Sequence, residues 1–545
     1  MKKIVISLFV ILSISSSFAQ KKTVKKSIQS KPKLVVGIMI DQMRWDFLYR
    51  YADRYSNNGF KKLMKEGFNC ENTYIPYAQS VTAVGHSTVY TGTTPTVHGI
   101  FSNDWYSRTL KRSIYCTEDS TVSILGGTEK SDPMSPKNLW TTTICDELRL
   151  ATNFKSKTIG IAIKDRGGIL PAGHSANAAY WYEELNGNWI TSSYYMKELP
   201  SWVSTFNNKK EVDNYYKNDW NTLYPITTYT QSSEDNKGYE EKFSHEKEPV
   251  FPHELKSKIG KDYGTIRNTP FGNSFTFSFA KSAIQNELLG KRNVTDFLAV
   301  SLSSPDYIGH QFGPNSIEIE DTYLRLDLEL ASFLSYLDNE LGKDNYLVFL
   351  TADHGVAHIP GYLNENKIPA SYVMNTSKEQ LSKLVAAKFK LNNIIENVSN
   401  YQFYLNYKAI DSAGLQIDEI KSFIIKKLLE DETVLTAYDI SELSETNLPK
   451  EIKEKFAKGY NSKFSGDIQF ILKSGYFSGK KTGTTHGTWN PYDARIPLLF
   501  YGWNIKKGNT KEKKYMTDIA PTIAALLNIQ EPNGSIGNVI TELFK

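Results

Sequence analysis

Three strand-length apolar runs are each followed closely by an aspartate, and this pattern limits the possible folds most strongly. The runs are residues 34–40, 295–302 and 346–350, and the acids that follow them are Asp41, Asp306 and Asp353. Runs of this length that are largely apolar, and continuously so at residues 34–40, are typical of strands buried on both faces of a parallel sheet. Because open α/β sheets bind ligands at the carboxyl ends of such strands, we expect a ligand site where these acids meet. The predicted fold is α/β, with a central, mostly parallel sheet flanked by helices.

Other segments extend this pattern over most of the 545 residues. Residues 157–163 form a further apolar run, 497–501 a final strand and 516–527 a closing helix. Alternating Tyr and Trp around residues 185–188 predict a β-hairpin. Leucines and a phenylalanine at helical spacing between residues 326 and 341 predict a helix with one buried face. The length is compatible with one large α/β domain that carries insertions.

The first 19 residues have the pattern of a secretory signal peptide. Lys2 and Lys3 precede an uncharged apolar run, and Ala19 ends a small-residue segment where cleavage is expected. The apolar run is too short to span a bilayer, although an uncleaved membrane anchor is the alternative. We therefore expect a secreted, periplasmic protein without a membrane anchor after cleavage.

The domain boundaries follow from changes in composition. Residues 20–32 are rich in Lys and Ser and are predicted to be a linker, and residues 33–545 are predicted to be the catalytic domain. Two segments lack the strand and helix pattern of the main sheet. They are predicted to be a surface insertion at about residues 190–268 and a cap subdomain at about residues 364–479.

Charge and cysteine content exclude some functions. Loss of Lys2 and Lys3 lowers the formal net charge from +5 to +3, which argues against nucleic-acid binding by bulk charge. Cys70, Cys116 and Cys145 lack metal-site spacing. At most one disulfide can form among them in an oxidising compartment, and the sequence leaves its pairing open.

Histidines accompany the strand-end aspartates and complete a set of metal ligands. The set contains three aspartates and three of the nine histidines of the chain: Asp41, Asp306, Asp353, His310, His354 and His486. Asp306 and His310 are four residues apart and could chelate one ion from a turn. Carboxylate and imidazole ligands suit zinc, and six ligands are enough for two sites with three ligands each. An Asp-His-Gly sequence also occurs in ordinary strand-to-loop turns, and Asp41 could instead cap a helix beginning near Trp45.

Two further positions could bind an anion. Thr82 lies just before a predicted helix that runs through Thr88, where a hydroxyl can act as a nucleophile beside free backbone N–H groups. The alternative is that Thr82 is a simple N-cap. Lys164 and Arg166 follow the apolar run 157–163 and could clamp an anion, or could form an ordinary solvated turn.

These motifs together resemble the alkaline phosphatase superfamily, in its PafA-type phosphate-insensitive branch close to the type I phosphodiesterases and nucleotide pyrophosphatases. The resemblance runs from about residue 33 to the C-terminus. It rests on Asp41, Thr82 with Gly85-His86, Asn103, Asp306 with His310, Asp353-His354-Gly355 and His486. Lys164-x-Arg166 resembles the feature that separates the phosphomonoesterases of this group from its phosphodiesterases.

The resemblance implies an alkaline-phosphatase-like fold, two Zn²⁺ ions and a role for each residue. One zinc is held by Asp306, His310 and His486, and the other by Asp41, Asp353 and His354. Thr82 is the nucleophile on the second zinc and becomes a phosphothreonine. The phosphoryl oxygens are held by Asn103, the Thr82 backbone N–H, Lys164 and Arg166.

The expected activity is hydrolysis of small phosphate monoesters with broad specificity by a monomer. A monoester carries an extra negative oxygen that Lys164 and Arg166 can meet, whereas a diester carries an organic group there. The alternatives are a phosphodiesterase or nucleotide pyrophosphatase on the same two metals, and a non-catalytic binding protein on a degenerate phosphatase scaffold. A sulfatase is disfavoured because the chain has no Cys- or Ser-x-Pro-x-Arg sequence.

The remaining histidines are expected to have other roles. His86 and His358 lie near the motifs and are predicted to support the ligands or the structure. The other four, predicted to be structural or exposed, are His98, His174, His245 and His253.

Overall fold

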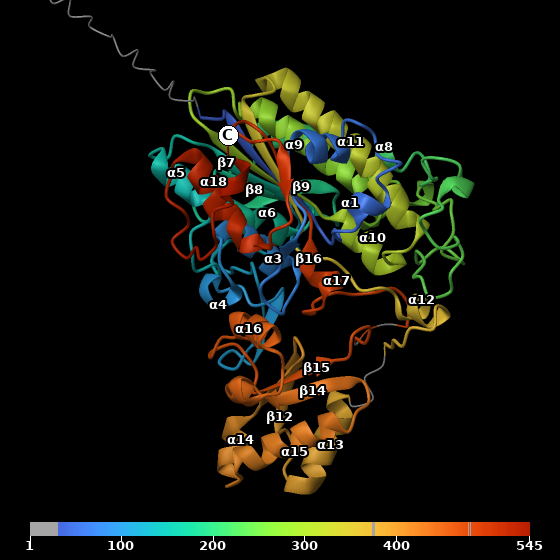
Figure 1. The fold of residues 1–545 in the computed structure, drawn as a ribbon, viewed down its shortest axis with the longest axis vertical. Helices are drawn as coiled ribbons and strands as arrows, with labels where there is room; N and C mark the ends of the chain where they lie inside the picture. Colours follow the sequence, from blue (N-terminus) through green and yellow to red (C-terminus); the bar gives the residue numbers. More distant parts are fainter. Residues whose placement is uncertain (1–30, 373–376, 478, 480, 545) are drawn as a thin grey trace, which may run out of the picture. The chain divides into compact units, whose positions relative to one another are not determined.

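Three buried parallel strands form the middle of a ten-stranded sheet. The computed structural model describes residues 31–372, 377–477, 479 and 481–544. The strand order is β18-β2-β17-β11-β1-β10-β7-β8-β9-β6 (Figure 1). Every residue of β1 (Leu34–Ile40), β10 (Asp296–Leu302) and β11 (Tyr346–Thr351) is buried, which explains why these strands are mostly apolar. The predicted α/β fold with a central, mostly parallel sheet is confirmed.

The remaining strands extend this sheet on both sides. β7 (Thr158–Ala162) and β8 (Ala178–Glu183) continue the parallel order, and β8 forms the predicted hairpin with antiparallel β9 (Asn188–Ser192). On the other side, β17 (Leu498–Gly502) pairs antiparallel with β11. The outer strands are β2 (Phe68–Cys70), β18 (Gly508–Thr510) and β6 (Ile124–Leu125). Short ladders outside this sheet are formed by β3 (Thr73–Tyr74), β4 (Asp104–Ser107), β5 (Arg112–Tyr115), β16 (Arg495–Ile496) and β19 (Lys514–Tyr515).

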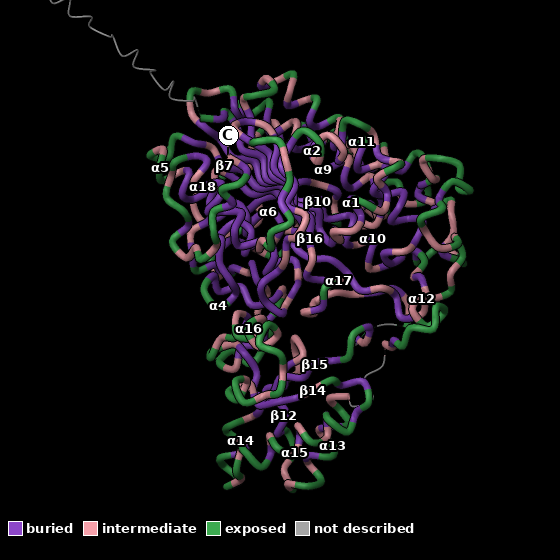
Figure 2. Tube along the Cα trace, in the orientation of Figure 1, coloured by how far each residue is buried: buried purple, intermediate pink, exposed green. Residues whose placement is uncertain are grey.

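Helices cover both faces of the sheet (Figure 1). One face carries α3 (Thr82–Thr91), α5 (Ile144–Ala151), α6 (Asp165–Ala172) and α18 (Ile519–Leu527). The other carries α2 (Phe60–Glu66), α9 (Phe271–Asn286), α10 (Ser304–Phe312) and α11 (Ile317–Leu341). The predicted leucine stripe of α11 is buried, as expected for an amphipathic helix against a sheet. Figure 2 shows the central strands as the most continuously buried part of the fold.

The register of the central strands brings their carboxyl ends to one edge of the sheet. Ile40 of β1 lies opposite Leu302 of β10, and Met39 lies opposite Thr351 of β11. The Asp41 backbone N–H then donates to the Leu302 carbonyl oxygen at 3.1 Å. The residues that follow all three strands are therefore neighbours in space.

The segment predicted as a cap contains its own sheet and core. Its four strands are in the order β12-β13-β15-β14, with bounds Ile395–Ser399, Gln402–Leu405, Ile468–Leu472 and Val434–Asp439. Its helices are α13 (Lys378–Phe389), α14 (Tyr407–Ser412), α15 (Ile417–Leu429) and α16 (Lys450–Gly459). Buried apolar side chains of α13, α15 and this sheet form a separate cluster. Short helices elsewhere are α1 (Phe47–Arg50), α4 (Pro95–His98), α12 (Pro360–Glu365) and α17 (Pro491–Ala494).

The segment predicted as a surface insertion has more internal order than its composition indicates. It contains α7 (Ser201–Asn208) and α8 (Glu211–Tyr215), and short 3₁₀ turns at Ile226–Thr228, Lys256–Lys258 and Gly264–Asn268. Trp220 and His253 in this segment are fully buried. The exact limits of this insertion, of the cap and of the catalytic domain stay predictions.

The sequence also leads to predictions about the N-terminal segment, membrane anchoring and the three cysteines. The predicted signal peptide, and the linker up to residue 30, lie outside the described residues. Among the described helices, none combines the length and the apolar character needed to cross a membrane. Cys70, Cys116 and Cys145 are all buried and unpaired.

His253 joins the insertion to α11 through a buried ion cluster. Its Nδ1 lies 3.1 Å from Glu246 Oε2, and its Nε2 lies 3.2 Å from Glu318 Oε1. Because a carboxylate only accepts hydrogen bonds, both ring nitrogens act as donors and the imidazole is positively charged. Burial alone would lower the pKa of His253, but Glu246 and Glu318 raise it to about 9.

This cluster predicts a pH-dependent contribution to stability. The pKa of His253 is raised in the folded state from 6.5 to about 9, so its contribution is fully present below pH 6.5 and is lost as the pH rises through about 9. The shift corresponds to about 3 kcal/mol. We expect His253→Gln to lower the free energy of unfolding, measured with urea, by more at pH 6 than at pH 10. The exposed His245, changed to Gln, is the matched control, and an equal loss at both pH values would contradict the ion cluster.

Candidate active site

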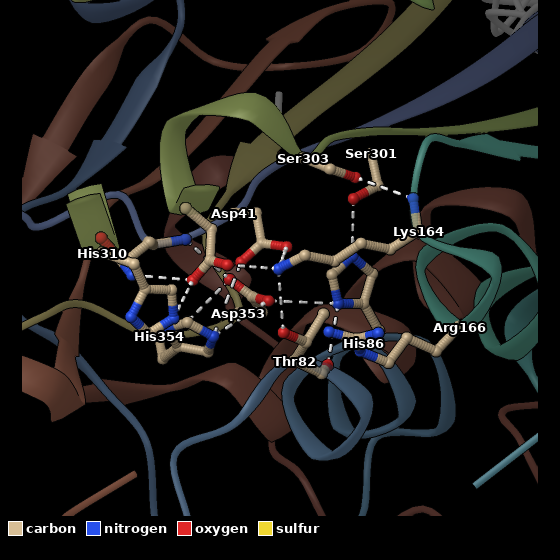
Figure 3. Close-up of polar contacts among 12 residues, drawn as sticks. Asp41, Thr82, His86, Lys164, Arg166, Ser301, Ser303, His310, Asp353 and His354 are labelled. Carbon is tan, nitrogen blue, oxygen red and sulfur yellow. Dashed lines mark hydrogen bonds and ion pairs between the residues drawn. The ribbon is translucent and has the colours of Figure 1, made fainter. Parts of the chain in front are cut away.

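At the sheet edge, Asp41 and Asp353 lie near Lys164 (Figure 3), and Asp306, the third predicted aspartate, contacts the same lysine. Lys164 Nζ donates to Asp41 Oδ2 at 2.8 Å and to Asp306 Oδ2 at 2.5 Å. It also lies 3.4 Å from Thr82 Oγ1. Burial opposes the charge on Lys164, but Asp306 and Asp41 raise its pKa above the usual range. The lysine is therefore a fixed positive charge between the acids and the hydroxyl.

Asp41, Asp353 and His354 form the first group of possible metal ligands. His354 Nε2 lies 3.5 Å from Asp41 Oδ1 and 3.4 Å from Asp353 Oδ2, and all three atoms are buried without a hydrogen-bond partner. Burial and the neighbouring Asp353 raise the pKa of Asp41, whereas burial lowers the pKa of His354 to about 3. Unpaired buried polar atoms are costly, so their convergence fits a site for a cation.

Asp306, His310 and His486 form a second cluster. His310 Nε2 lies 3.3 Å and His486 Nε2 lies 3.4 Å from Asp306 Oδ1. Potential ligand atoms of Asp306, His354 and His486 also lie within 4.8 Å of one another, so His354 takes part in both groups. His310 therefore lies at the edge of this cluster, beside Asp306.

The outer nitrogens of the three histidines orient them in the same way. Nδ1 of His310, His354 and His486 lies 2.8, 2.9 and 2.8 Å from the backbone oxygens of Thr484, Gly355 and Ser80. A carbonyl oxygen cannot donate, so each Nδ1 must carry the proton. In the neutral ring Nε2 then keeps its lone pair toward the aspartates, which is the arrangement of a metal-binding histidine. The residues present therefore fit a divalent metal.

Asp306 and His310 lie on a helix, which corrects the prediction that they lie on a turn. Both belong to α10, and four residues of helix place them on the same face. Burial opposes the charge on Asp306, but His310 and Lys164 lower its pKa well below the usual range. The helix thus presents an ionised carboxylate and an imidazole side by side.

Thr82 is the first residue of α3, and the N-cap is Val81. The alternative that Thr82 is an N-cap is therefore wrong. The role of a capping group falls to Asn103, whose Oδ1 accepts from the Ala83 backbone N–H at 2.9 Å. Asp41 is not a helix cap either, because α1 follows Asp46.

Gly85 allows α3 to pack closely on the metal-binding edge. A Cβ atom at this position would lie 2.6 Å from Asp353 Cβ, which is too close for any side chain. One turn earlier on the same helix, Thr82 is brought beside Lys164. The absence of a side chain at Gly85 thus allows α3 to place the Thr82 hydroxyl beside Lys164.

Arg166 lies in the first turn of α6, two residues after Lys164. Its guanidinium donates to Tyr115 Oη at 3.0 Å, and its buried Nε has no hydrogen-bond partner. Lys164 and Arg166 line the same cavity of about 320 Å³, together with Arg267 and Tyr307. Both predicted cations therefore face one space, and the alternative of an ordinary solvated turn does not hold.

Sequence reasoning missed Gln42, which ties the two ligand groups together. Its Nε2 donates to Asp306 Oδ1 at 2.7 Å, and its backbone N–H donates to Asp353 Oδ1 at 3.1 Å. Gln42 adopts a φ of 66°, an uncommon left-handed conformation for this residue type. Only its position directly after Asp41 could have drawn attention to it.

His86 contacts the site without belonging to either ligand group. Its Nδ1 lies 2.9 Å from the Thr82 carbonyl oxygen and 3.3 Å from Asp353 Oδ2, and its Nε2 lies 2.8 Å from Ser301 Oγ. His358 lies farther out, with Nδ1 2.6 Å from Asn315 Oδ1. His98 is fully buried against Thr88 and the Ile100 backbone, as expected for a structural residue.

A cap residue holds the segment around Asn103. Ser102 Oγ donates to Asn400 Oδ1 and Asn400 Nδ2 donates to the Asp104 carbonyl oxygen, both at 2.9 Å. Asn400 lies at the tip between β12 and β13 with a φ of 53°. The tip of the cap hairpin is thus bonded to both neighbours of Asn103.

A family model for "Type I phosphodiesterase / nucleotide pyrophosphatase" matches residues 35–494. The chain belongs to this family. Alkaline phosphatase PhoV of Synechococcus elongatus is 50% identical to it over 98% of both chains. Alkaline phosphatase PafA of Elizabethkingia meningoseptica is 47% identical, again over 98% of both chains. A Myroides odoratus protein named calcium-transporting ATPase is 54% identical over 94% of this chain and 95% of its own.

The crystal structure of wild-type PafA is similar along the whole fold. It superposes with a TM-score of 0.92 at 47% identity and covers 94% of this chain and 99% of its own. The predicted PafA-type member of the alkaline phosphatase superfamily, with the enzyme class of an alkaline phosphatase, is confirmed by these relatives.

The two ligand groups predict separable metal sites. Zinc-loaded wild-type protein should retain two ions per chain after desalting, and Asp353→Asn should retain about one, because its group loses a charged ligand. Elemental mass spectrometry measures the content, and melting temperature monitors folding. Asp344→Asn, at an exposed position, is the matched control. Wild-type metal content in the Asp353→Asn protein would contradict this ligand group.

Proposed function

We propose that this chain is a secreted, zinc-dependent phosphomonoesterase of broad specificity that works through a phosphothreonine at Thr82. The supporting observation is the convergence at one sheet edge of two acid–imidazole groups, a helix N-terminal hydroxyl and a buried lysine. Lys164 alone contacts Asp41, Asp306 and Thr82. Few functions other than transfer of an anionic group use such a combination.

Zinc is the metal that we assign to both groups. Asp306, His310 and His486 would hold one ion, and Asp41, Asp353 and His354 the other. Each group offers three protein ligands, which are carboxylates and imidazole nitrogens with a fixed tautomer. Three ligands leave a coordination position open for substrate, as catalytic zinc sites require. When bound, the two ions would supply Lewis-acid stabilisation for the attacking and the leaving oxygen.

Thr82 would attack phosphorus, and the position of its side chain favours this role. Its Oγ1 is at the N-terminus of α3, where the helix dipole favours negative charge, and 3.4 Å from the Lys164 ammonium. Both features stabilise an alkoxide relative to the alcohol. Water would then release phosphate from Thr82 and restore the hydroxyl.

Asn103, Lys164 and Arg166 would bind the phosphoryl oxygens. The Asn103 amide is oriented by its Oδ1 contact with Ala83, which leaves its NH₂ group to donate to an anion. A solved PafA variant, named as substituted at a threonine, an asparagine, a lysine and an arginine, changes the same four residue types in the same chain order. This parallel supports the four assignments here.

The phosphodiesterase alternative predicts that Lys164 and Arg166 point away from the ligand groups and that an apolar pocket lies beside Thr82. Lys164 contacts both groups, which favours a monoesterase. A partly apolar cavity does lie next to Val81, so a comparison of substrates is the deciding experiment. The Myroides relative named as an ATPase is compatible with the proposal, since ATP hydrolysis also transfers a phosphoryl group to water.

The nucleophile is tested by Thr82→Ala. We expect kcat/KM for an aryl phosphate to fall by about three orders of magnitude or more. The intact mass of acid-quenched protein should show a phosphoryl group on wild type and none on the variant, while zinc stays near two per chain. Thr205→Ala, in an exposed position of α7, is the control. Wild-type turnover by Thr82→Ala would refute the assignment.

The charged clamp is tested by Lys164→Ala and Arg166→Ala. Each should lower kcat/KM for an aryl phosphate monoester by about 100-fold or more, because an oriented cation is lost from a buried site. The methyl diester of the same phenol should lose far less, since it lacks the extra negative oxygen. Zinc-loaded and chelated enzyme are compared in parallel. Equal losses on both esters would remove the case for a monoester clamp.

A further inference from the structure

A cavity of about 480 Å³ opens beside the second ligand group and extends under the cap. Val81 and His486 line it on the side of the main sheet, and Val398, Tyr401 and Phe470 line it on the side of the cap. His486 belongs to the Asp306 cluster, so the cavity adjoins the candidate site directly. The roles proposed for the residues of the candidate site do not involve this cavity.

Part of the cap wall of this cavity is aromatic, and Lys378 and Glu379 line another part of it. The rings of Tyr401 and Phe470 meet edge to face with centroids 5.6 Å apart, and Phe403 packs on Phe470 at 5.5 Å. Phe403 and Phe470 are buried, whereas Tyr401 is partly exposed. A planar apolar group entering the cavity would therefore meet ring faces and edges, an arrangement that stabilises aromatic contacts.

A second cavity, of about 570 Å³, adjoins the other side of the same cluster at His310. Its wall carries charged side chains, among them Glu241, Lys242 and Asp262. Six charged side chains line this second cavity, whereas two, Lys378 and Glu379, line the cavity under the cap. An apolar group would have to remove water from more charges in the second cavity, and the cavity under the cap offers it the aromatic surface. The two cavities thus differ in the chemistry that they favour.

In-line transfer places the leaving oxygen opposite Thr82 Oγ1. With Thr82 assigned to the Asp41 group, the proposed function gives that oxygen to the metal held by Asp306, His310 and His486. The organic part of the leaving alcohol must continue from there into one of the two cavities. We propose that the cavity under the cap, with Tyr401 as its main contact, is a subsite for aromatic leaving groups. This inference rests on the proposed function and names its preferred substrates as phosphate monoesters of phenols and similar planar alcohols.

Phosphoryl transfer at this site exchanges one phosphorus–oxygen bond for another. The bond between Thr82 Oγ1 and phosphorus forms while the bond between phosphorus and the aryl oxygen breaks. The Thr82 proton passes to solvent, and the released aryl oxide takes a proton from water. The subsite contributes only contacts with the ring and does not take part in proton transfer.

Kinetics with three ligands tests the subsite. For Tyr401→Ala, kcat/KM for 2-naphthyl phosphate should fall about 10-fold or more, as is typical for loss of apolar contact in a pocket. The same variant should lose less than about twofold on methyl phosphate, and inhibition by inorganic phosphate should be unchanged, because neither ligand reaches the ring. Tyr401→Phe, which keeps the ring, should restore naphthyl phosphate hydrolysis.

Binding without turnover gives an independent readout. Calorimetry with a naphthylmethyl phosphonate and with methylphosphonate measures affinity for a ligand that cannot be hydrolysed. Tyr401→Ala should weaken binding of the naphthyl compound about 10-fold and leave methylphosphonate unchanged. Tyr460→Ala, an exposed tyrosine of the cap that lines neither cavity, is the matched control and should change neither affinity.

The outcomes separate the subsite from the proposed function. Equal losses of Tyr401→Ala on all monoesters would overturn the subsite and leave the phosphomonoesterase intact. A selective loss on naphthyl phosphate in Lys242→Ala, with Tyr401→Ala unaffected, would place the leaving group in the other cavity and also overturn it. Absence of hydrolysis of every monoester by zinc-loaded wild type would refute the proposed function itself.

Discussion

Mutual repulsion of three buried carboxylates is the constraint on which this site depends. The parallel register of β1, β10 and β11 brings Asp41, Asp306 and Asp353 to one edge, where burial strengthens the repulsion between them. Lys164 offsets part of this charge through contacts with two of the three. The histidines add imidazole nitrogens that can bind a metal. The edge therefore gathers more carboxylates than Lys and Arg side chains, and this excess favours the binding of divalent cations.

Much of this arrangement can be predicted from local sequence. An uninterrupted apolar run such as residues 34–40 predicts a strand that is covered on both faces, and β1 is such a strand. Parallel strands end at a common edge of the sheet, so the sequence alone predicts that Asp41 and Asp353 lie close together. The position of Lys164 and Arg166 at the same edge could be predicted for the same reason, since β7 is parallel to its neighbour β10.

Other features depend on contacts between residues far apart in the chain, which no local pattern encodes. The tautomer of His486 is set by the Ser80 carbonyl oxygen, 406 residues away in sequence. Gln42 reaches Asp306 only because Gly309 has no side chain in its path. The helix that carries Asp306 and His310 begins with Ser-Pro, a pair that is equally common in turns. The charged state of His253 requires two glutamates on separate segments.

The bond pattern of Asn400 has a consequence for how enzymes of this type can diversify. The tip of the cap hairpin is tied to Ser102 and Asp104, and the same hairpin carries Tyr401. Sequence changes in this hairpin that fit a new leaving group would therefore also disturb the loop that holds Asn103. If Tyr401 and Asn103 have the roles proposed for them, leaving-group selectivity and phosphoryl binding change together, and a cap exchanged between relatives should work only when it brings both Asn400 and the aromatic residues of its cavity wall.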